Sequence, residues 1–293
     1  MTGNGGTVHS IKSENISIKA NDYEGLVQFA QKRRVNLVIP GPDQCLVDGI
    51  EGYFRAVGIP VFGPSVLAAR MEGSKSFSKD FMSRWKIPTA SYERFSSFEE
   101  AKSYIQTVKG EIVIKADGLA AGKGVLLPKT KQEAITGLES IMIKKEFGTA
   151  GNEVVIEEFL QGQELSVLAI SDGYTVLPLP PAQDHKAIGE GDTGLNTGGM
   201  GTYAPTPIAT PELNAKIVKV LQTTIDGMRK EGFPFVGCLF VGFMIGQDGE
   251  PKVLEYNVRF GDPETQSVLA LLETDLAELL LASSYLFFRF FDA

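Results

Sequence analysis

A short run near the carboxyl end of the chain, Leu254–Glu264, constrains the fold more than any other segment. Apolar and polar residues alternate over Val253–Val258, which predicts a β-strand, and a dense polar turn follows it. A period of two places Glu255 and Asn257 on one face of the strand, where oxygens of both can reach one hard cation. Charged loops at strand ends are a common place for the chemistry of α/β enzymes. An edge strand with a solvated polar face is the alternative interpretation of this segment alone.

The composition is that of a globular protein without a bias toward nucleic acid. With 293 residues, 43% of them hydrophobic and 22% charged, the chain can bury a large core and form two domains. The formal net charge is −8 and no basic stripe is present, which argues against a non-specific nucleic-acid binder. A phosphorylated ligand would therefore be bound through local donors and a metal ion.

The ends and the cysteines indicate a cytoplasmic protein that binds no membrane. No secretory signal follows Met1, and the apolar tail Leu279–Phe291 is too short to span a bilayer and contains Arg289. Cys45 and Cys238 are far apart in sequence, match no metal-binding or redox spacing, and lie among apolar residues. We expect both to be buried free thiols in a reducing compartment.

The order of predicted elements is typical of an α/β fold. Helix and strand alternate at the start of the chain, which indicates a doubly wound unit with a parallel sheet. Its expected elements are helices at 22–33 and 48–57 and strands at 35–40 and 59–62. After a break at 63–65 the pattern changes to α+β. The further expected elements are helices at 66–71, 75–85, 96–109 and 131–143, and strands at 111–115, 125–127, 154–158 and 165–171, the last paired with 175–178.

The segment Ile114–Val125 combines a strand end, three glycines and two lysines. Glycines allow backbone N–H groups to approach an anion closely, and Lys115 and Lys123 add positive charge. The spacing is not that of a Walker A loop, because no Ser or Thr and no helix follow. We therefore favour phosphate binding over the alternative, a hairpin turn with an exposed lysine.

A second motif, Val154–Leu160, is a strand that ends in Glu-Glu-Phe-Leu. The backbone of such an ending could serve as a hinge that reads the edge of an adenine, with Glu164 within reach of ribose hydroxyls. Alone the signal is weak, because strands with exposed glutamates are common, and its value lies in its order after the lysine loop.

Taken in order, the glycine loop between strands, the Glu-Glu-Phe-Leu hinge and the terminal Glu-x-Asn strand resemble the ATP-grasp fold. The chain is most similar to the phosphoribosylamine–glycine ligase family, and the likeness extends from about residue 3 to about residue 282. The segments that carry it are Glu72–Lys75, Ile114–Gly124, Gln183–Lys186, Gly194–Tyr203 and Glu255–Gln266. Another ATP-grasp carboxylate–amine ligase is disfavoured by the match at 184–186 and 194–203.

The resemblance implies an ATP-dependent carbon–nitrogen ligase of purine biosynthesis. Glycine would take the γ-phosphoryl group of ATP to give an acyl phosphate, and the amine of 5-phosphoribosylamine would then attack its carbonyl carbon. The products would be glycinamide ribonucleotide, ADP and phosphate. This chemistry requires charge neutralisation and alignment more than covalent help from the protein.

By the same resemblance, the nucleotide and its ion are assigned to three groups of residues. Glu255 and Asn257 would bind Mg²⁺ or Mn²⁺ between the phosphates, as suits a hard ion with oxygen ligands. The residues assigned to ATP are Lys75, Lys115, Gly122, Lys123 and Gly124 for the phosphates, Glu157, Glu158, Phe159 and Leu160 for adenine, and Glu164 for the ribose.

The substrate side is assigned in the same way. Arg259, Asp184 and Lys186 are the expected catalytic residues, with Arg259 stabilising the transferred phosphoryl group or the carboxylate; a surface ion pair with Asp262 or Glu264 is the alternative for it. The expected substrate contacts are Gly41, Pro42, Asp43, His185, Gly198, Gly199, Met200, Gly201, Asp262, Pro263 and Glu264. His185 is expected to position a substrate and not to transfer a proton. Asp43 replaces the family's usual Glu.

The ends depart from the family pattern. The spacing of Gly3–Thr7 to Gly41 indicates that the first strand, the phosphate loop and the first helix of the family are missing, and Ser283–Ala293 resembles nothing in it. We expect a partial doubly wound domain over 1–72, an ATP-grasp domain over 73–282 with a lid at about 93–162, and an unrelated apolar tail over 283–293. Two functions stay open: an active ligase, or a truncated non-catalytic fragment that only binds Mg·ATP.

Overall fold

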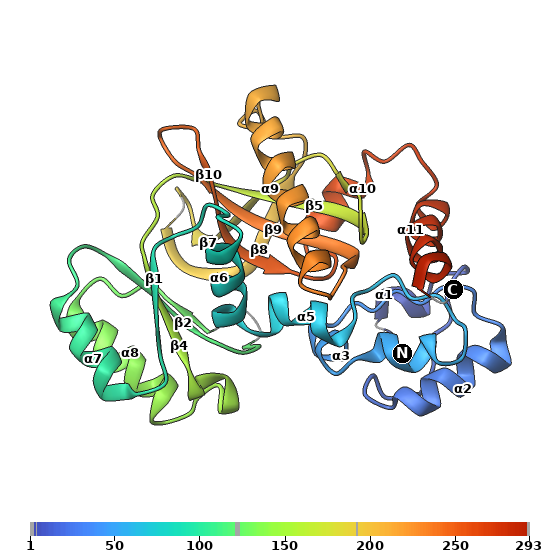
Figure 1. Ribbon diagram of the computed structural model, residues 1–293, viewed down its shortest axis with the longest axis horizontal. Coiled ribbons are helices and arrows are strands. Elements are labelled where there is room, and N and C mark those ends of the chain that lie inside the picture. Colours follow the sequence, from blue (N-terminus) through green and yellow to red (C-terminus); the bar gives the residue numbers. More distant parts are fainter. Residues whose placement is uncertain (1–2, 4, 121–123, 192, 292–293) are drawn as a thin grey trace.

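The computed structural model describes residues 3, 5–120, 124–191 and 193–291, which form three regions (Figure 1). A helical N-terminal region lies at one end of the molecule, and the C-terminal helix lies beside it. A sheet with long helices forms the middle, and a smaller sheet with two helices forms the other end. Helix α6 (Lys75–Arg84) lies between the two sheets.

The N-terminal region is less regular than the sequence predicts. The two expected strands run parallel but meet in a single bridge between Val38 and Val61, so no extended parallel sheet forms among the described residues. Pro40 and Pro60 explain this shortening, because proline has no N–H to donate to a ladder. The expected helix over 48–57 is interrupted by Gly49, which has φ +85°. The helices are α1 Gly5–Val8, α2 Tyr23–Arg33, α3 Asp43–Val47, α4 Ile50–Arg55 and α5 Val66–Gly73.

The lid is a four-stranded antiparallel sheet in the order β1-β4-β2-β3, covered by two helices. Side-chain caps begin both helices, since Ser97 accepts from the N–H of Glu100 and Thr130 accepts from the N–H of Glu133. The sheet and helices share one apolar core that includes Ile105, Ile114, Leu138 and Ile156, among others. The elements are β1 Tyr92–Phe95, α7 Phe98–Thr107, β2 Ile112–Ala116, β3 Val125–Leu126, α8 Lys131–Met142, the 3₁₀ helix η1 Gly148–Asn152 and β4 Val154–Glu158.

The central sheet, in the order β10-β9-β5-β6, is antiparallel and has one buried and one more open face. On β10, Val253, Tyr256 and Val258 belong to the main core, whereas Glu255 and Asn257 are only half-buried. A register shift between Val253 and Glu255 breaks the strict alternation without moving either polar residue into the core. The elements are β5 Gln163–Asp172, β6 Val176–Pro178, α9 Pro211–Lys230, β9 Val236–Ile245 and β10 Pro251–Asn257.

The glycine-rich segment over 183–203, for which no strand was predicted, forms a two-stranded antiparallel hairpin. Strands β7 (Gln183–Gly189) and β8 (Thr193–Tyr203) pair with two register shifts, so the hairpin is irregular and bent. Helices α10 (Glu264–Leu269) and α11 (Leu276–Phe291) complete the chain, and the expected boundary at residue 282 falls inside α11.

Cys45 and Cys238 are buried and free, as expected. Among the helices that the structure describes, none combines the length and apolarity needed to cross a membrane.

Candidate functional site

The end of β10 carries the polar pair predicted from the sequence, and an arginine lies next to it. Arg259 donates through Nη2 to Oδ1 of Asn257 at 3.2 Å and forms an ion pair with Oε1 of Glu72 at 3.0 Å. The other oxygen of Glu72 accepts from the N–H of Val258 at 2.7 Å. Burial raises the pKa of Glu72 even though Arg259 opposes this. Helix α5 therefore orients Arg259, which pairs with neither of the two acids considered in the sequence analysis.

Four cations act electrostatically on the carboxylate of Glu255. Burial opposes its ionisation, but Lys115, Lys186, Lys75 and Arg259 together lower its pKa below the ordinary value. Within the described residues no three His, Cys, Asp or Glu side chains form a metal-binding group. Any metal held here would therefore take protein oxygens from Glu255 and Asn257 and the remaining ligands from another molecule.

Lys115, at the end of β2, crosses from the lid to the central sheet. Its Nζ donates to the carbonyl oxygen of Leu254 at 3.1 Å and forms an ion pair with Oε1 of Glu157 at 3.0 Å. Oε2 of Glu157 is 3.0 Å from Nζ of Lys79, and all three side chains are almost fully buried. The carboxylate of Glu157, assigned to adenine in the sequence analysis, is thus enclosed between two lysines.

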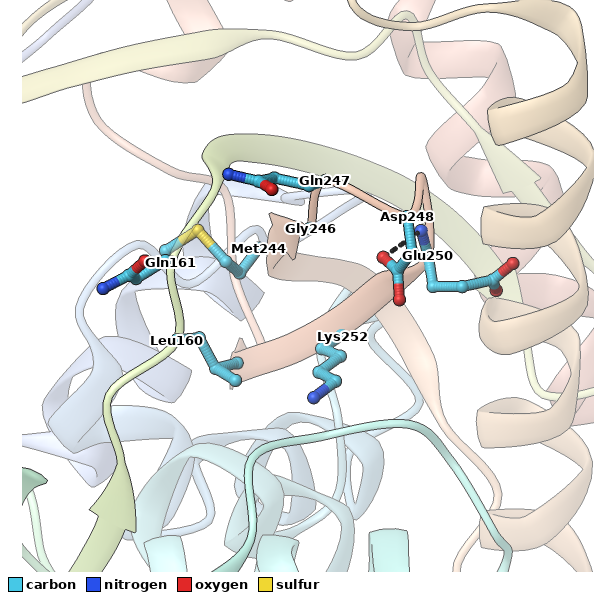
Figure 2. Close-up of a pocket in the computed structure, with 8 residues that line it drawn as sticks. All are labelled: Leu160, Gln161, Met244, Gly246, Gln247, Asp248, Glu250 and Lys252. Atoms are coloured by element: carbon cyan, nitrogen blue, oxygen red, sulfur yellow. Dashed lines mark hydrogen bonds between the residues drawn. The ribbon is translucent and has the colours of Figure 1, made fainter. Parts of the chain in front are cut away.

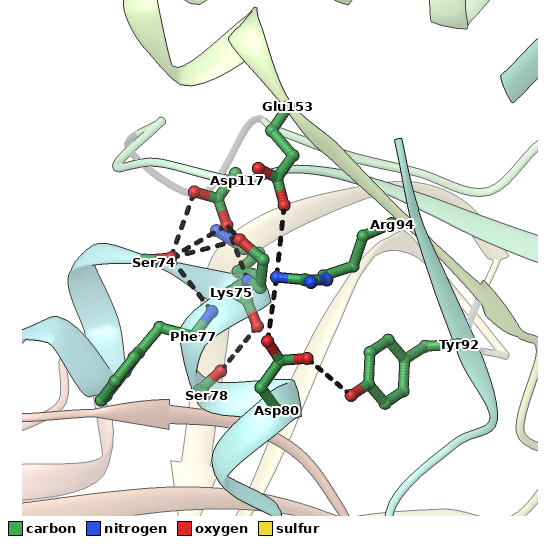
Figure 3. A network of polar contacts seen from close by, with 10 residues as sticks. Ser74, Lys75, Phe77, Ser78, Asp80, Tyr92, Arg94, Asp117 and Glu153 are labelled. Atoms are coloured by element: carbon green, nitrogen blue, oxygen red, sulfur yellow. Dashed lines mark hydrogen bonds and ion pairs between the residues drawn. The ribbon is translucent and has the colours of Figure 1, made fainter. Parts of the chain in front are cut away.

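Lys75 begins α6 and lies against the start of the glycine loop. Its backbone N–H donates to the carbonyl of Asp117 at 3.0 Å, and its Nζ donates to the carbonyl of Gly118 at 3.3 Å. The carboxylate of Asp117 accepts from the hydroxyl of Ser74 and from the N–H of Ser76 at the N-terminus of α6 (Figure 3). Burial lowers the pKa of Lys75, with Glu255 opposing. These contacts fix the loop to the same helix that carries Lys75.

A second set of contacts in Figure 3 ties α6 to the outer strand of the lid. Asp80 accepts from the hydroxyl of Tyr92 at 2.9 Å and pairs with Nη1 of Arg94, also at 2.9 Å. The position of the lid over the central sheet is therefore set largely through α6.

The glycine loop itself is only partly described. Gly122 and Lys123 lie outside the described residues. A Cβ at Gly124 would be 2.7 Å from the Cβ of Ala120, so the returning strand can pack there only without a side chain.

The expected hinge after β4 borders a pocket of about 280 Å³ (Figure 2). The N–H groups of Glu158 and Phe159 donate to carbonyls of neighbouring strands, at 3.0 Å each. Leu160 follows them and lines the pocket together with Met244 of β9 and Lys252 of β10. The pocket is thus at the outer end of the open face that carries Glu255. The carboxylate of Glu158 accepts from the N–H of Ser91, and this bond lowers its pKa.

On the other side of Glu255, the hairpin β7–β8 contributes Lys186. Its Nζ forms a 2.9 Å ion pair with Oε2 of Glu164 on β5. Burial disfavours the charge, yet Glu164 and Glu255 raise the pKa of Lys186 above its usual value. Glu164, assigned to the ribose, is therefore linked to the substrate-side strand.

Two buried acids near Lys186 have oxygens without partners. Neither carboxylate oxygen of Asp184 has a hydrogen bond of ordinary geometry among the described residues, and neither does Oε2 of Glu264. Their side chains are 9% and 3% exposed. Burial raises the pKa of both, with Lys186 opposing in each case. Gly199 has φ +137°, and a Cβ there would be 3.1 Å from Oδ1 of Asp184, so the backbone approaches this acid closely.

The remaining assigned residues surround this area less tightly. His185 is exposed and stacks on Tyr203 with ring centroids 5.8 Å apart. The hydroxyl of Thr202 donates to the carbonyl of Pro263, and the side chain of Asp262 accepts from Gln266. Gly41 and Gly201 have no atom within 4 Å of a built Cβ, Pro42 and Met200 are exposed, and Asp43 begins α3. The surroundings of Gly198 lie outside what the structure describes.

Three polar residues at the site were absent from the sequence assignment. Glu72 holds Arg259, Lys79 holds Glu157, and Asp117 holds the start of α6. Glu72 lies in a segment that carried the family resemblance, and Asp117 lies in the glycine-loop segment, so both had a signal. Lys79 had none, because a lysine on a helix is usually exposed.

Comparisons with known proteins agree with this geometry. Residues 73–265 match the ATP-grasp (A) domain of phosphoribosylglycinamide synthetase, and residues 1–72 match its N domain. The bifunctional purine biosynthetic protein PUR2,5 of Pichia angusta is 63% identical over 96% of this chain, and the match covers 36% of that protein. The chain thus spans about a third of the length of this fungal relative.

Two solved structures extend the comparison. The phosphoribosylamine–glycine ligase of Thermotoga maritima has a TM-score of 0.82 and 36% identity, covering 97% of this chain and 68% of that one. A biotin carboxylase domain from Hydrogenobacter thermophilus, solved with MgADP and bicarbonate, has a TM-score of 0.71 and 17% identity, covering 92% and 59%. The second likeness shows the fold alone. With its family match over two thirds of the chain and its structural likeness to the Thermotoga enzyme, the chain belongs to the phosphoribosylglycinamide synthetase family and has the ATP-grasp fold.

Proposed function

We propose that this chain binds Mg·ATP between the lid and the open face of the central sheet. The observation that carries the proposal is the geometry beside Glu255, where Lys115 donates to the carbonyl of Leu254 and Arg259 donates to the side chain of Asn257 on the same strand. Three of the four cations that act on Glu255 already have a carboxylate partner of their own, Glu157 for Lys115, Glu164 for Lys186 and Glu72 for Arg259, so they are fixed in place and a polyphosphate with its metal ion would share them. Triphosphate oxygens would therefore lie between the lysines and the ion.

The donor set of β10 fits a hard divalent cation. Glu255 and Asn257 offer oxygen atoms only, as Mg²⁺ and Mn²⁺ prefer, and Asn257 keeps a lone pair besides the one that accepts from Arg259. When bound, the ion would neutralise charge on the β- and γ-phosphates. Arg259, held by Glu72, would stabilise the transferred phosphoryl group.

The adenine would occupy the outer end of the same face. Leu160 and Met244 line the pocket there. The N–H groups of Glu158 and Phe159, which precede Leu160 in the hinge, are already bonded within the lid. A purine needs an apolar surface to stack against, and Leu160 and Met244 supply one. Glu164 would contact the ribose from β5.

On the substrate side we propose the ligation of glycine to 5-phosphoribosylamine. A carboxylate oxygen of glycine would attack the γ-phosphorus and release ADP; the amine nitrogen would then attack the carbonyl carbon and release phosphate. Asp184 and Glu264 would accept hydrogen bonds from nitrogen-bearing groups of the substrates, because both oxygens of Asp184 and Oε2 of Glu264 have no hydrogen-bond partner among the described residues. The hairpin residues 198–201 and the turn at 262–264 would enclose the substrates, and Gly41–Asp43 would face the phosphoribosylamine.

The domain division expected from the sequence supports this arrangement. An N-terminal unit over 1–72 and an ATP-grasp unit from 73 onward would meet at Glu72, and the lid over about 93–162 would close on the nucleotide.

The test is ADP release by the purified chain with Mg·ATP, glycine and phosphoribosylamine generated in situ. ADP that depends on both substrates is the expected result. A folded chain that binds Mg·ATP and releases no ADP under these conditions would overturn the ligase activity and leave a nucleotide-binding fragment. Omission of glycine and of the amine in turn provides the controls.

A further inference from the structure

The protein holds the ammonium group of Lys115 at two points. One interaction is the ion pair with Oε1 of Glu157 at 3.0 Å, and another is the hydrogen bond to the carbonyl of Leu254 at 3.1 Å. An ammonium group held at two points has a fixed direction for its third N–H. Leu254 directly precedes Glu255, so that direction is set relative to the metal-binding end of β10.

Glu157 is in turn held by Lys79, a buried lysine on α6. The side chain of Lys79 is 2% exposed, and its Nζ is 3.0 Å from Oε2 of Glu157. The same Nζ donates to the hydroxyl of Thr89 at 2.7 Å, and this hydroxyl donates to the carbonyl of Val253 at 2.6 Å. Lys79 therefore connects Glu157 to the same strand, β10, that Lys115 reaches.

The arrangement does more than neutralise charge. Each oxygen of Glu157 faces a different lysine, one from α6 and one from β2, so the carboxylate cannot turn toward either without losing the other. Without Glu157, the carboxylate of Glu255 would be the remaining acid near Lys115, and an ion pair with it would occupy the metal ligand.

We propose that Glu157 and Lys79 are positioning residues that keep Lys115 directed at the nucleotide and away from Glu255. Lys79 acts only through Glu157. This inference rests on the proposed Mg·ATP site.

The test compares the variants Glu157→Gln, Lys79→Met and the double variant by calorimetric titration with Mg²⁺ and the non-hydrolysable analogue AMP-PNP. We expect Glu157→Gln to weaken the Kd by about tenfold or more and to raise the Mg²⁺ concentration needed for half-saturation. Lys79→Met should weaken the Kd by about threefold. In the double variant, the Kd should equal that of Glu157→Gln within about twofold, because Lys79 has nothing left to hold.

Thermal unfolding separates positioning from simple stability. Glu157→Gln leaves two buried lysines without an anion, whereas the double variant leaves one, so the double variant should regain Tm without regaining affinity. Glu51→Gln, which removes another buried acid paired with an arginine in the N-terminal region, is the matched control and should leave the Kd unchanged.

Three results would overturn the inference. The first is a Glu157→Gln variant with the Kd and Mg²⁺ requirement of the wild type, and the second is a double variant whose affinity returns together with its Tm. The third is additivity of the two single effects. A wild-type chain that fails to bind Mg²⁺ and AMP-PNP would overturn the proposed function as well, which distinguishes that failure from the other three.

Discussion

Two groups of buried charge flank Glu255, and they differ in how completely the protein satisfies them. On the lid side, Glu157 has a lysine at each oxygen. On the hairpin side, Asp184 and Glu264 keep three oxygens without a hydrogen bond among the described residues. Oε1 of Glu157 also has no hydrogen bond of ordinary geometry, but it has the ion pair with Lys115. Both groups are buried, so the difference is one of pairing and not of exposure.

The difference indicates what each side does with a ligand. A buried cluster whose charges are already paired needs no partner from a ligand, so its effect on a ligand is to orient the side chains that contact it. Buried acceptors without donors raise the free energy of the folded chain until a ligand supplies the donors. If the proposed function holds, we expect the lid side to orient a cation and the hairpin side to receive a nitrogen-bearing substrate.

The largest expected effect is at Glu255, where the two sides meet through Lys115 and Lys186. Replacing Glu255 with Ala removes the only carboxylate of the donor pair and leaves the surrounding cations to repel one another. Affinity for Mg²⁺ with AMP-PNP should fall by more than about 100-fold, measured by titration calorimetry. The far-ultraviolet circular dichroism should stay that of the wild type. Unchanged affinity in a folded variant would place the nucleotide elsewhere.

The next effect tests the unpaired side directly. Asp184→Asn keeps the shape of the side chain and removes its charge, so binding of glycine in the presence of Mg²⁺ and AMP-PNP should weaken by about 10–100-fold, measured by equilibrium dialysis. Nucleotide affinity should stay within about twofold, since Asp184 is on the substrate side. Equal loss of both ligands would contradict the division into two sides.

The same substitution should also stabilise the empty chain. Burial raises the pKa of Asp184 in the folded state, so the folded chain binds more protons than the unfolded chain just above the ordinary pKa. The contribution of Asp184 to the free energy of unfolding therefore falls as pH rises through that window and remains unfavourable at neutral pH. Asp184→Asn removes the penalty, and its Tm should exceed that of the wild type by about 2 °C or more at pH 7, with a smaller gain at pH 4.

Local sequence patterns predicted much of the framework of the site. Strand β4 has the predicted bounds, and the strand that carries Glu255 and Asn257 is present with both residues half-buried. Such signals depend on neighbours within a few residues, and alternation or a helix cap is visible there. The parallel direction of the two strands that meet at Val38 and Val61 was also predicted, whereas their shortening by two prolines was not.

Long-range pairing explains what the sequence did not reveal. Glu72 meets Arg259 and Lys79 meets Glu157 only after the chain has folded, and nothing local marks a lysine for burial. The strands of the hairpin β7–β8 were not predicted, because the glycines of this segment hide the alternation of a strand. The resemblance to the family thus pointed to Asp184, whereas only the folded structure shows that its carboxylate oxygens have no hydrogen-bond partner among the described residues.

A smaller effect concerns the apolar end of the nucleotide face. Met244 lines the pocket beside Leu160, so Met244→Ala should remove apolar contact with the adenine and weaken AMP-PNP binding by about three- to tenfold. Binding of glycine should not change. Fluorescence competition with ATP, ADP and tripolyphosphate would measure this, because only ligands with a base should lose affinity. Equal losses for tripolyphosphate would mean that the substitution disturbs the phosphate end instead.

The smallest effect tests the paired side by titrating it. Burial lowers the pKa of Lys79 to about 8, with Glu157 opposing, so raising the pH from 7 to 9 should neutralise Lys79 and imitate Lys79→Met. Over this pH range, the affinity of the wild type for AMP-PNP should weaken by about threefold more than the affinity of the Lys79→Met variant does.

Stability should move in the opposite direction. Between pH 8 and 10.5 the unfolded chain holds a proton on this lysine that the folded chain has lost, so unfolding becomes harder as pH rises. An affinity that falls while stability rises cannot come from general loosening of the fold. A wild-type pH profile that superimposes on that of Lys79→Met in both measurements would show that the charge of Lys79 has no effect on the site, and the contrast between the paired and unpaired sides would lose its lid-side half.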